Sequence, residues 1–136
     1  MRSWLSALLL AAFAAFSPAL AAGDLTVVET PVTIANGTSL SASVDLGANR
    51  VFGVVMPAAW TAAGLTFQGS SDGINFFDLF DDGGTEVSVT VAASKFVVLA
   101  APVKMLSVRW IKVRSGTTGS PVNQGADRIV KLVGVP

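Results

Sequence analysis

The stretch that decides the fold runs Leu65-Thr66-Phe67-Gln68-Gly69-Ser70-Ser71-Asp72-Gly73-Ile74-Asn75-Phe76-Phe77-Asp78-Leu79-Phe80. Apolar Leu65 and Phe67 alternate with polar residues, and a second run, rich in aromatic side chains, begins at Asn75. A half-buried strand requires this period of two because successive side chains point to opposite faces. Asp72-Gly73 supplies the turn between the runs, since both residue types tolerate positive φ. The stretch therefore predicts a β-hairpin.

Strand-like alternation recurs on both sides of this hairpin. Residues 40–46 and 87–91 alternate apolar with small polar residues, and residues 108–113 and 128–135 mix apolar with basic ones. Turn dipeptides such as Asp82-Gly83 separate these runs. Residues 22–136 show no sustained period of 3.6, which an amphipathic helix would need. About eight strand-like segments predict one all-β domain, a single antiparallel β-sandwich of jelly-roll type.

Two segments are apolar at consecutive positions instead of alternating ones. They cover residues 51–56 and 96–99. Such runs are typical of central strands that are covered on both faces. A strand buried at a subunit contact would show the same pattern, so both interpretations stay open.

The first 21 residues differ from the rest of the chain. Arg2 precedes an apolar run over residues 4–16, and Ala19-Leu20-Ala21 follows as a small-x-small cleavage site. This order is typical of a secretory signal peptide, and the run is shorter than the roughly 20 apolar residues that span a bilayer. We therefore expect a removable signal peptide over residues 1–21, a β-sandwich domain over residues 22–136, and export to the periplasm or beyond. No membrane span is expected after cleavage.

The composition restricts the chemistry that the domain can perform. The chain has no cysteine, no histidine and no tyrosine. Disulfides and thiolate metal sites are therefore excluded, and the commonest general base and metal ligand is missing. Nine basic residues balance nine acidic ones, so the chain lacks the positive footprint of a nucleic-acid-binding protein. We expect a protein that binds or assembles, that is not an enzyme, and that has no nucleic acid partner.

Acidic residues near the hairpin are candidates for a metal site. Asp78, Asp81 and Asp82 are close enough in sequence to offer oxygen ligands to calcium, which is the one cofactor that the sequence suggests. Their spacing is not that of an EF-hand loop, and solvated turn aspartates are the simpler interpretation. A carboxylate pair for glycoside hydrolysis is the one simple catalytic option that the composition leaves.

A glycan site is the second candidate. Trp60 lies between two predicted strands, where its ring could stack on a sugar or anchor a partner. Asp72 and Asn75 in the hairpin turn are the polar residues expected to complete this site. The alternative for Trp60 is a lid over one end of the sandwich. Trp110 lies in the middle of a predicted strand and is expected in the core.

Aromatic side chains at the end of the hairpin indicate self-association. Alternation sends Phe76 and Phe80 to one face, and Phe77 and Leu79 to the other. One pair is expected in the core, and the other against a second layer or a neighbouring subunit. We therefore expect a homo-oligomer or contacts with other virion or surface proteins.

Basic residues gather on the two C-terminal strands. If these strands are neighbours, pairing with acidic residues across strands accounts for them, and binding of an anionic glycan is the alternative. The residues concerned are Arg109, Lys112, Arg114, Arg128 and Lys131.

One resemblance concerns the fold. Residues 65–79, followed by Val108-Arg109-Trp110-Ile111-Lys112-Val113, resemble discoidin-like, or galactose-binding-like, jelly rolls. In those domains a Ser-x-Asp-Gly turn and an aromatic strand precede an Arg-aromatic strand. The resemblance implies a jelly roll, and with the candidate glycan residues it gives the alternative function, an exported carbohydrate-binding module.

A longer resemblance concerns the function. Residues 30–135 are similar to small structural proteins encoded in the morphogenesis regions of tailed phages and prophages. Motifs that carry the similarity include Thr33-Ile34-Ala35-Asn36-Gly37, Met56-Pro57-Ala58-Ala59-Trp60-Thr61 and Gln124-Gly125-Ala126-Asp127-Arg128. The resemblance implies a non-enzymatic virion component, such as a decoration or accessory protein. Such a protein needs no signal peptide, so either the domain was recruited for export or the chain starts near Val27.

Overall fold

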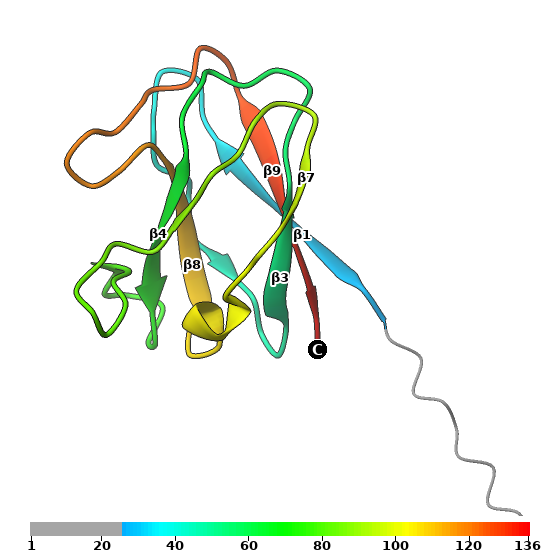
Figure 1. The fold of residues 1–136 in the computed structure, drawn as a ribbon, viewed down its shortest axis with the longest axis vertical. Helices are drawn as coiled ribbons and strands as arrows, with labels where there is room; N and C mark the ends of the chain where they lie inside the picture. The colour runs from blue at the N-terminus through cyan, green and yellow to red at the C-terminus, as the bar shows by residue number, and fades with distance from the viewer. Residues whose placement is uncertain (1–25) are drawn as a thin grey trace, which may run out of the picture.

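The hairpin predicted from residues 65–80 is present in the computed structural model, which describes residues 26–136 (Figure 1). Strand β4 (Leu65–Ser70) pairs antiparallel with β5 (Phe77–Asp78), and Gly73 lies in the turn between them with a φ of 76°. Such a positive φ is the conformation that glycine adopts without strain. The predicted signal peptide, residues 1–21, lies outside the described residues.

Nine strands and a short 3-10 helix, η1 (Pro102–Met105), make up the regular structure of the described part of the chain. The strands other than β4 and β5 are β1 (Val28–Ile34), β2 (Val44–Asp45), β3 (Arg50–Val55), β6 (Ser88–Val89), β7 (Phe96–Val98), β8 (Trp110–Ser115) and β9 (Arg128–Val135). They form two antiparallel sheets in a β-sandwich, which confirms the all-β prediction (Figure 1).

The two sheets interleave segments that are far apart in sequence. Sheet A has the strand order β1-β9-β3-β7. Sheet B has the order β2-β8-β4-β5, with β6 also paired to β4. The two C-terminal strands that carry the basic residues, β8 and β9, therefore lie in different sheets and are not neighbours.

The core lies between the sheets and follows the predicted alternation. Leu65 and Phe67 of β4 are fully buried. Gln68, the next residue, lies on the outer face, where its side-chain amide donates a hydrogen bond to the Asp78 carboxylate. Each fully buried aliphatic or aromatic side chain contributes about 1.5–3 kcal/mol by leaving water. The other fully buried aliphatic side chains come from both sheets and are Val32, Ile34, Val54, Ile111, Val113, Val130 and Leu132.

The segment 40–46 is less regular than its alternation predicts. Only Val44–Asp45 forms a strand, and Ser41 is buried whereas Ala42 is exposed. The Ser41 hydroxyl accepts a hydrogen bond from the Val113 N–H at 2.9 Å and donates one to the Ala42 carbonyl at 2.8 Å. The hydroxyl thus satisfies a backbone N–H group of β8. Because it is itself hydrogen-bonded, its burial costs little free energy of folding.

Trp110 lies on the outer face of sheet B, so the prediction that it belongs to the core is wrong. The Arg109 guanidinium lies 4.3 Å from the ring centroid, and a Cβ atom at Gly73 would be 3.0 Å from the ring. The next residue, Ile111, is the one that is fully buried. Because both residues are apolar, the sequence alone did not decide which of the two points inward.

The two consecutive apolar segments have different environments. Strand β3 lies between β9 and β7, and its Val51 and Val54 are buried, as expected of a central strand. Strand β7 is the edge of sheet A, and its Phe96 and Val98 are 60% and 75% exposed. Strand β3 is therefore central as predicted, but it is not covered on both faces, because Phe52 is 41% exposed. Strand β7 is an edge strand, so the prediction of a central strand is wrong for residues 96–99.

Candidate functional site

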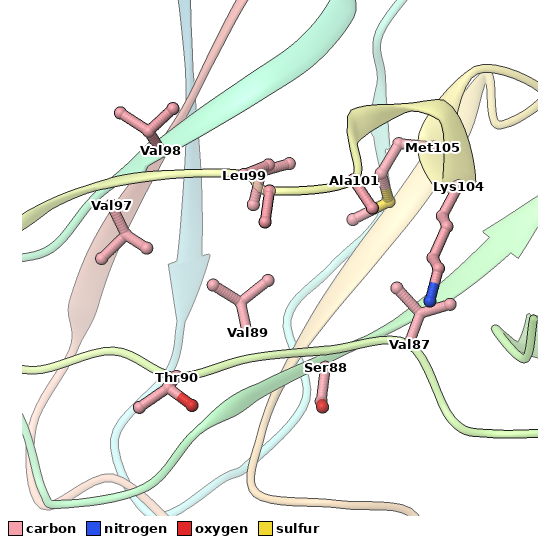
Figure 2. Close-up of a pocket in the computed structure, with 11 residues that line it drawn as sticks. Val87, Ser88, Val89, Thr90, Val97, Val98, Leu99, Ala101, Lys104 and Met105 are labelled. Atoms are coloured by element: carbon pink, nitrogen blue, oxygen red, sulfur yellow. The ribbon is translucent and has the colours of Figure 1, made fainter.

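One side of the sandwich is open between its two sheets. Strand β7 forms the edge of sheet A there, and an apolar cleft of about 350 Å³ separates it from residues 87–90 of sheet B (Figure 2). We refer to β7, residues 87–90 and the cleft between them as the open side. The apolar residues that line the cleft are Val87, Val89, Val97, Val98, Leu99, Ala100, Ala101 and Met105, and the polar ones are Ser88, Thr90 and Lys104.

The backbone of β7 is paired on one side and free on the other. The Met56 N–H donates to the Lys95 carbonyl at 2.8 Å, and the Leu99 N–H donates to the Phe52 carbonyl at 2.9 Å. Alternate residues of an antiparallel strand point their backbone groups to the same neighbour. The N–H and C=O groups of Phe96 and Val98 therefore point away from β3, and no strand within residues 26–136 pairs with them.

Side chains add an apolar surface to this free edge. Val97 and Val98 project to opposite sides of β7, with Val97 toward the cleft (Figure 2). The Phe96 ring lies over Gly53 of β3, where a Cβ atom would be 2.8 Å from its Cε1 atom. The missing side chain of Gly53 thus provides the space in which the exposed ring is held.

The opposite edge of sheet A is protected, in contrast to β7. Strand β1 carries Pro31 and Glu29, and the Glu29 carboxylate accepts a hydrogen bond from the Lys131 ammonium at 3.0 Å. Prolines and charged side chains on edge strands hinder pairing with another chain. Between Phe96 and Val98, strand β7 has neither, and its short length is its remaining protection.

The residues predicted for a glycan site lie at opposite ends of β4. Trp60 precedes β4, packs against the core and donates from Nε1 to the Ala63 carbonyl at 3.0 Å. Asp72 and Asn75 follow β4, whose length of about 17 Å separates them from Trp60. The Asp72 carboxylate accepts hydrogen bonds at 2.8 Å from the N–H groups of Ile74 and Asn75 and from the Asn75 amide. These bonds hold the pKa of Asp72 far below its usual range. They also stabilise the turn that contains Asp72 and Asn75, so the polar groups of both residues already have partners within it.

The acidic residues predicted for calcium face different partners. Asp81 accepts a hydrogen bond from the Lys104 ammonium at 2.8 Å, which lowers the pKa of Asp81. Asp78 faces Arg114, whose hydrogen bond lowers the pKa of Asp78. Asp82 is exposed. Within residues 26–136, no three acidic side chains gather as a group that could hold a metal ion.

The phenylalanines predicted for self-association lie outside the core. Phe77 and Phe80 are 71% and 53% exposed. Phe76 is half-buried beneath the Lys112 ammonium, which lies 4.3 Å from its ring centroid. Leu79 packs against the core but Phe77, predicted to share its face, does not, so the prediction that one of the two pairs lies in the core is wrong.

Arg114 pairs with acidic residues as predicted, in a buried cluster on the outer face of sheet B whose members the sequence did not identify. The Arg114 side chain is 9% exposed, and its guanidinium donates to the Asp78 carboxylate, to Glu86 at 3.4 Å and to the Thr118 hydroxyl at 2.7 Å. The cluster ties β8 to β5 and to the loop around Thr118. Its charges were visible in the sequence, but only pairing of distant strands brings them together.

Two of the remaining basic residues, Arg109 and Lys131, agree with the predicted pairing with acidic residues, whereas Lys112 lies over Phe76 and Arg128 forms no ion pair with the described residues. Arg109 pairs with Asp45 at 3.1 Å, and Lys131 pairs with Glu29 at 3.0 Å. The bond from Arg109 lowers the pKa of Asp45. Each of these ion pairs forms within one sheet. Neither joins β8 to β9, because these two strands lie in different sheets.

No protein-family model matches the chain, and no curated protein and no solved structure matches it. Among the residues that the structure describes, no helix has both the length and the apolar character that crossing a membrane requires. The geometry of the open side is therefore the observation from which a function is inferred.

Proposed function

We propose that the chain is a non-enzymatic assembly domain that associates with further copies of itself through the open side. The free edge of β7 beside the apolar cleft carries this proposal. A strand from another chain can satisfy such an edge with backbone hydrogen bonds while its alternate side chains enter an adjoining pocket. Contiguous exposed apolar surface of this kind is typical of interaction sites.

The resemblance of residues 30–135 to small structural proteins of tailed phages supports the same class of function. On this basis the domain, with a sandwich of jelly-roll type, serves as a virion decoration or accessory protein. Many copies arrayed on one particle bind with an avidity about 10²–10⁴ above that of a single contact, so each contact can be weak. The location is the virion if the chain starts near Val27, and the periplasm or the outside of the cell if residues 1–21 direct export.

The alternative function, an exported carbohydrate-binding module, has weaker support. The residues predicted for its site are separated by the length of β4. Two aromatic rings on the outer face of sheet B already hold a cation, because Arg109 covers Trp110 and Lys112 covers Phe76. A sugar that stacks on these faces would have to displace the cation.

Light scattering during size-exclusion chromatography tests the proposal. We expect a mass that exceeds that of the monomer, 13.9 kDa for the full chain, and that rises with protein concentration. Phe96→Lys should return the protein to the monomer. Ile74→Lys is the control, because Ile74 is 81% exposed but lies outside the open side, and it should leave the mass unchanged. A protein that stays monomeric at every concentration and binds sugars on a glycan array would overturn the proposal.

A further inference from the structure

We infer that β7 pairs antiparallel with β7 of a second copy, with Val97 of each copy at the twofold axis. The inference rests on the proposed function and adds to it the register of the contact. Sheet A of one copy then continues into sheet A of the other. A twofold contact uses the same surface on both partners, so this surface must be complementary to itself.

The free backbone groups of β7 fit this register. In an antiparallel pair, residues with facing N–H and C=O groups exchange both hydrogen bonds with the residue directly opposite. The free groups belong to Phe96 and Val98, on either side of Val97. With Val97 on the axis, Phe96 lies opposite Val98 of the second copy, and the twofold repeats this pair on the other side. Every free group of β7 then has a partner.

The side chains and charges are compatible with the same register. Phe96 and Val98 both project to the outer face, so each pair across the axis joins an aromatic and a β-branched side chain, a favoured cross-strand combination. Residues 96–103 carry no charge. Lys95 falls opposite Leu99 of the second copy, so the two Lys95 side chains do not face each other. Strand β1 could not pair in this way, because Pro31 lacks an N–H and Glu29 is charged.

The size of the contact sets its strength. An aromatic side chain buries about 150–250 Å², so the two Phe96 rings supply at most roughly 500 Å². A stable protein interface buries about 1,200–2,000 Å² in total. The paired β7 strands are therefore expected to form a weak, reversible dimer in solution, which arraying on a larger particle would strengthen.

A cysteine at the axis tests the register, since the natural chain contains no cysteine. In Val97→Cys the two thiols would face each other in a non-hydrogen-bonded pair with Cα atoms about 4.5 Å apart, within the range of a disulfide. The matched control is Val103→Cys, because Val103 is 68% exposed whereas Val97 is half-buried. We expect mild oxidation of the full-length protein to link the Val97→Cys variant roughly tenfold faster than the control.

The rates distinguish pairing from random collision. Collision alone would favour the more exposed thiol, so a rate for Val97→Cys at or below that of Val103→Cys overturns the register. Adding Val98→Lys to Val97→Cys places a charge in the paired edge and should slow the linkage to the control rate. A rate that this second change leaves intact also overturns the register.

Amide hydrogen exchange of the wild-type protein provides a test that needs no variant. The N–H groups of Phe96 and Val98 should become protected as the protein concentration rises, while exposed loop amides stay unchanged. If light scattering shows self-association that Phe96→Lys abolishes but these two amides stay unprotected, the assembly function stands and the β7 register fails. If the protein is monomeric throughout, both the function and the register fail.

Discussion

Arg114 is the residue whose replacement gives the sharpest test of what holds sheet B together. Arg114→Met keeps the apolar stem of the side chain and removes the guanidinium. The change removes the cation that Asp78 and Glu86 both contact, and leaves their two negative charges without a positive partner. Their side chains are 26% and 17% exposed, so each carboxylate is largely, but not fully, withdrawn from water.

The exposure of these partners sets the expected loss of stability. Removing one member of a fully buried ion pair costs about 3–5 kcal/mol, because a charge is left without compensation. Here water reaches both carboxylates in part, so we expect a loss of about 2–3 kcal/mol at pH 7. Arg109→Met is the matched control, since Arg109, directly before β8, also pairs with a carboxylate, Asp45 of β2, but is 57% exposed. We expect it to change the stability far less.

The pH dependence of this loss follows from the lowered pKa of Asp78. A carboxyl group whose pKa is lower in the folded state contributes stability above its unfolded pKa, near 3.9, and loses it as the pH falls through the folded pKa. The hydrogen bond from Arg114 is the main cause of this lowering. The wild type should therefore lose stability in acid, whereas Arg114→Met should lose less. The gap between the two proteins should therefore be smaller at pH 3 than at pH 7.

Urea unfolding followed by tryptophan fluorescence measures the gap, with far-UV circular dichroism as a second probe. The slope with urea should be unchanged, so that a shift in midpoint reports stability directly. A gap of the same size at pH 7 and pH 3 would refute the electrostatic reasoning. So would a loss for Arg114→Met no larger than that for Arg109→Met.

Three further substitutions test the fold. Phe67→Ala removes a fully buried ring and should cost about 3–5 kcal/mol in urea unfolding; a loss below 1 kcal/mol would contradict its place in the core. Gly134→Ala places a Cβ atom 2.1 Å from the Arg50 carbonyl oxygen. The pairing between β9 and β3 must therefore shift, and we expect a loss of stability of about 1–3 kcal/mol. The control is Gly119→Ala, whose Cβ atom meets no atom within 4 Å and which should lower the urea midpoint little. Ser41→Ala leaves the Val113 N–H without its hydroxyl partner and should cost about 1–3 kcal/mol, with the exposed Ala42→Ser as a neutral control; equal midpoints for the two would contradict the role of this hydroxyl.

The local features of the fold were readable from the sequence. The hairpin of residues 65–80 was predicted because its period of two and its Asp72-Gly73 turn are properties of adjacent residues. The burial of Leu65 and Phe67 followed from the same alternation. The prediction was poorer for residues 40–46, where a hydroxyl of Ser41 replaces a backbone partner, and for Trp110, whose apolar neighbour takes the inward position.

The candidate site was only partly visible in the sequence. The apolar run at residues 96–99 allowed a subunit contact, but it also allowed a covered central strand. The glycan residues Trp60 and Asp72 were grouped because both lie in loops beside β4, and the structure places them at its two ends. The Arg114 cluster pairs Arg114 with Asp78, 36 positions before it, and the sequence gave no sign of which charged residues would meet.

The sequence by itself determined that this protein is built from short strands, without cysteine chemistry and without histidine. Those properties depend on residue type and on the spacing of neighbours, so no tertiary contact is needed to read them. Only the tertiary structure decided which strands are edges. The pairing of β9 with β1 and β3 across the length of the domain leaves β7 at the edge of sheet A, with Phe96 and Val98 in solvent. Strand order is set by long-range packing of the inner faces, which many sequences of the same periodicity could satisfy differently. The open side is thus a consequence of topology that no local pattern contains.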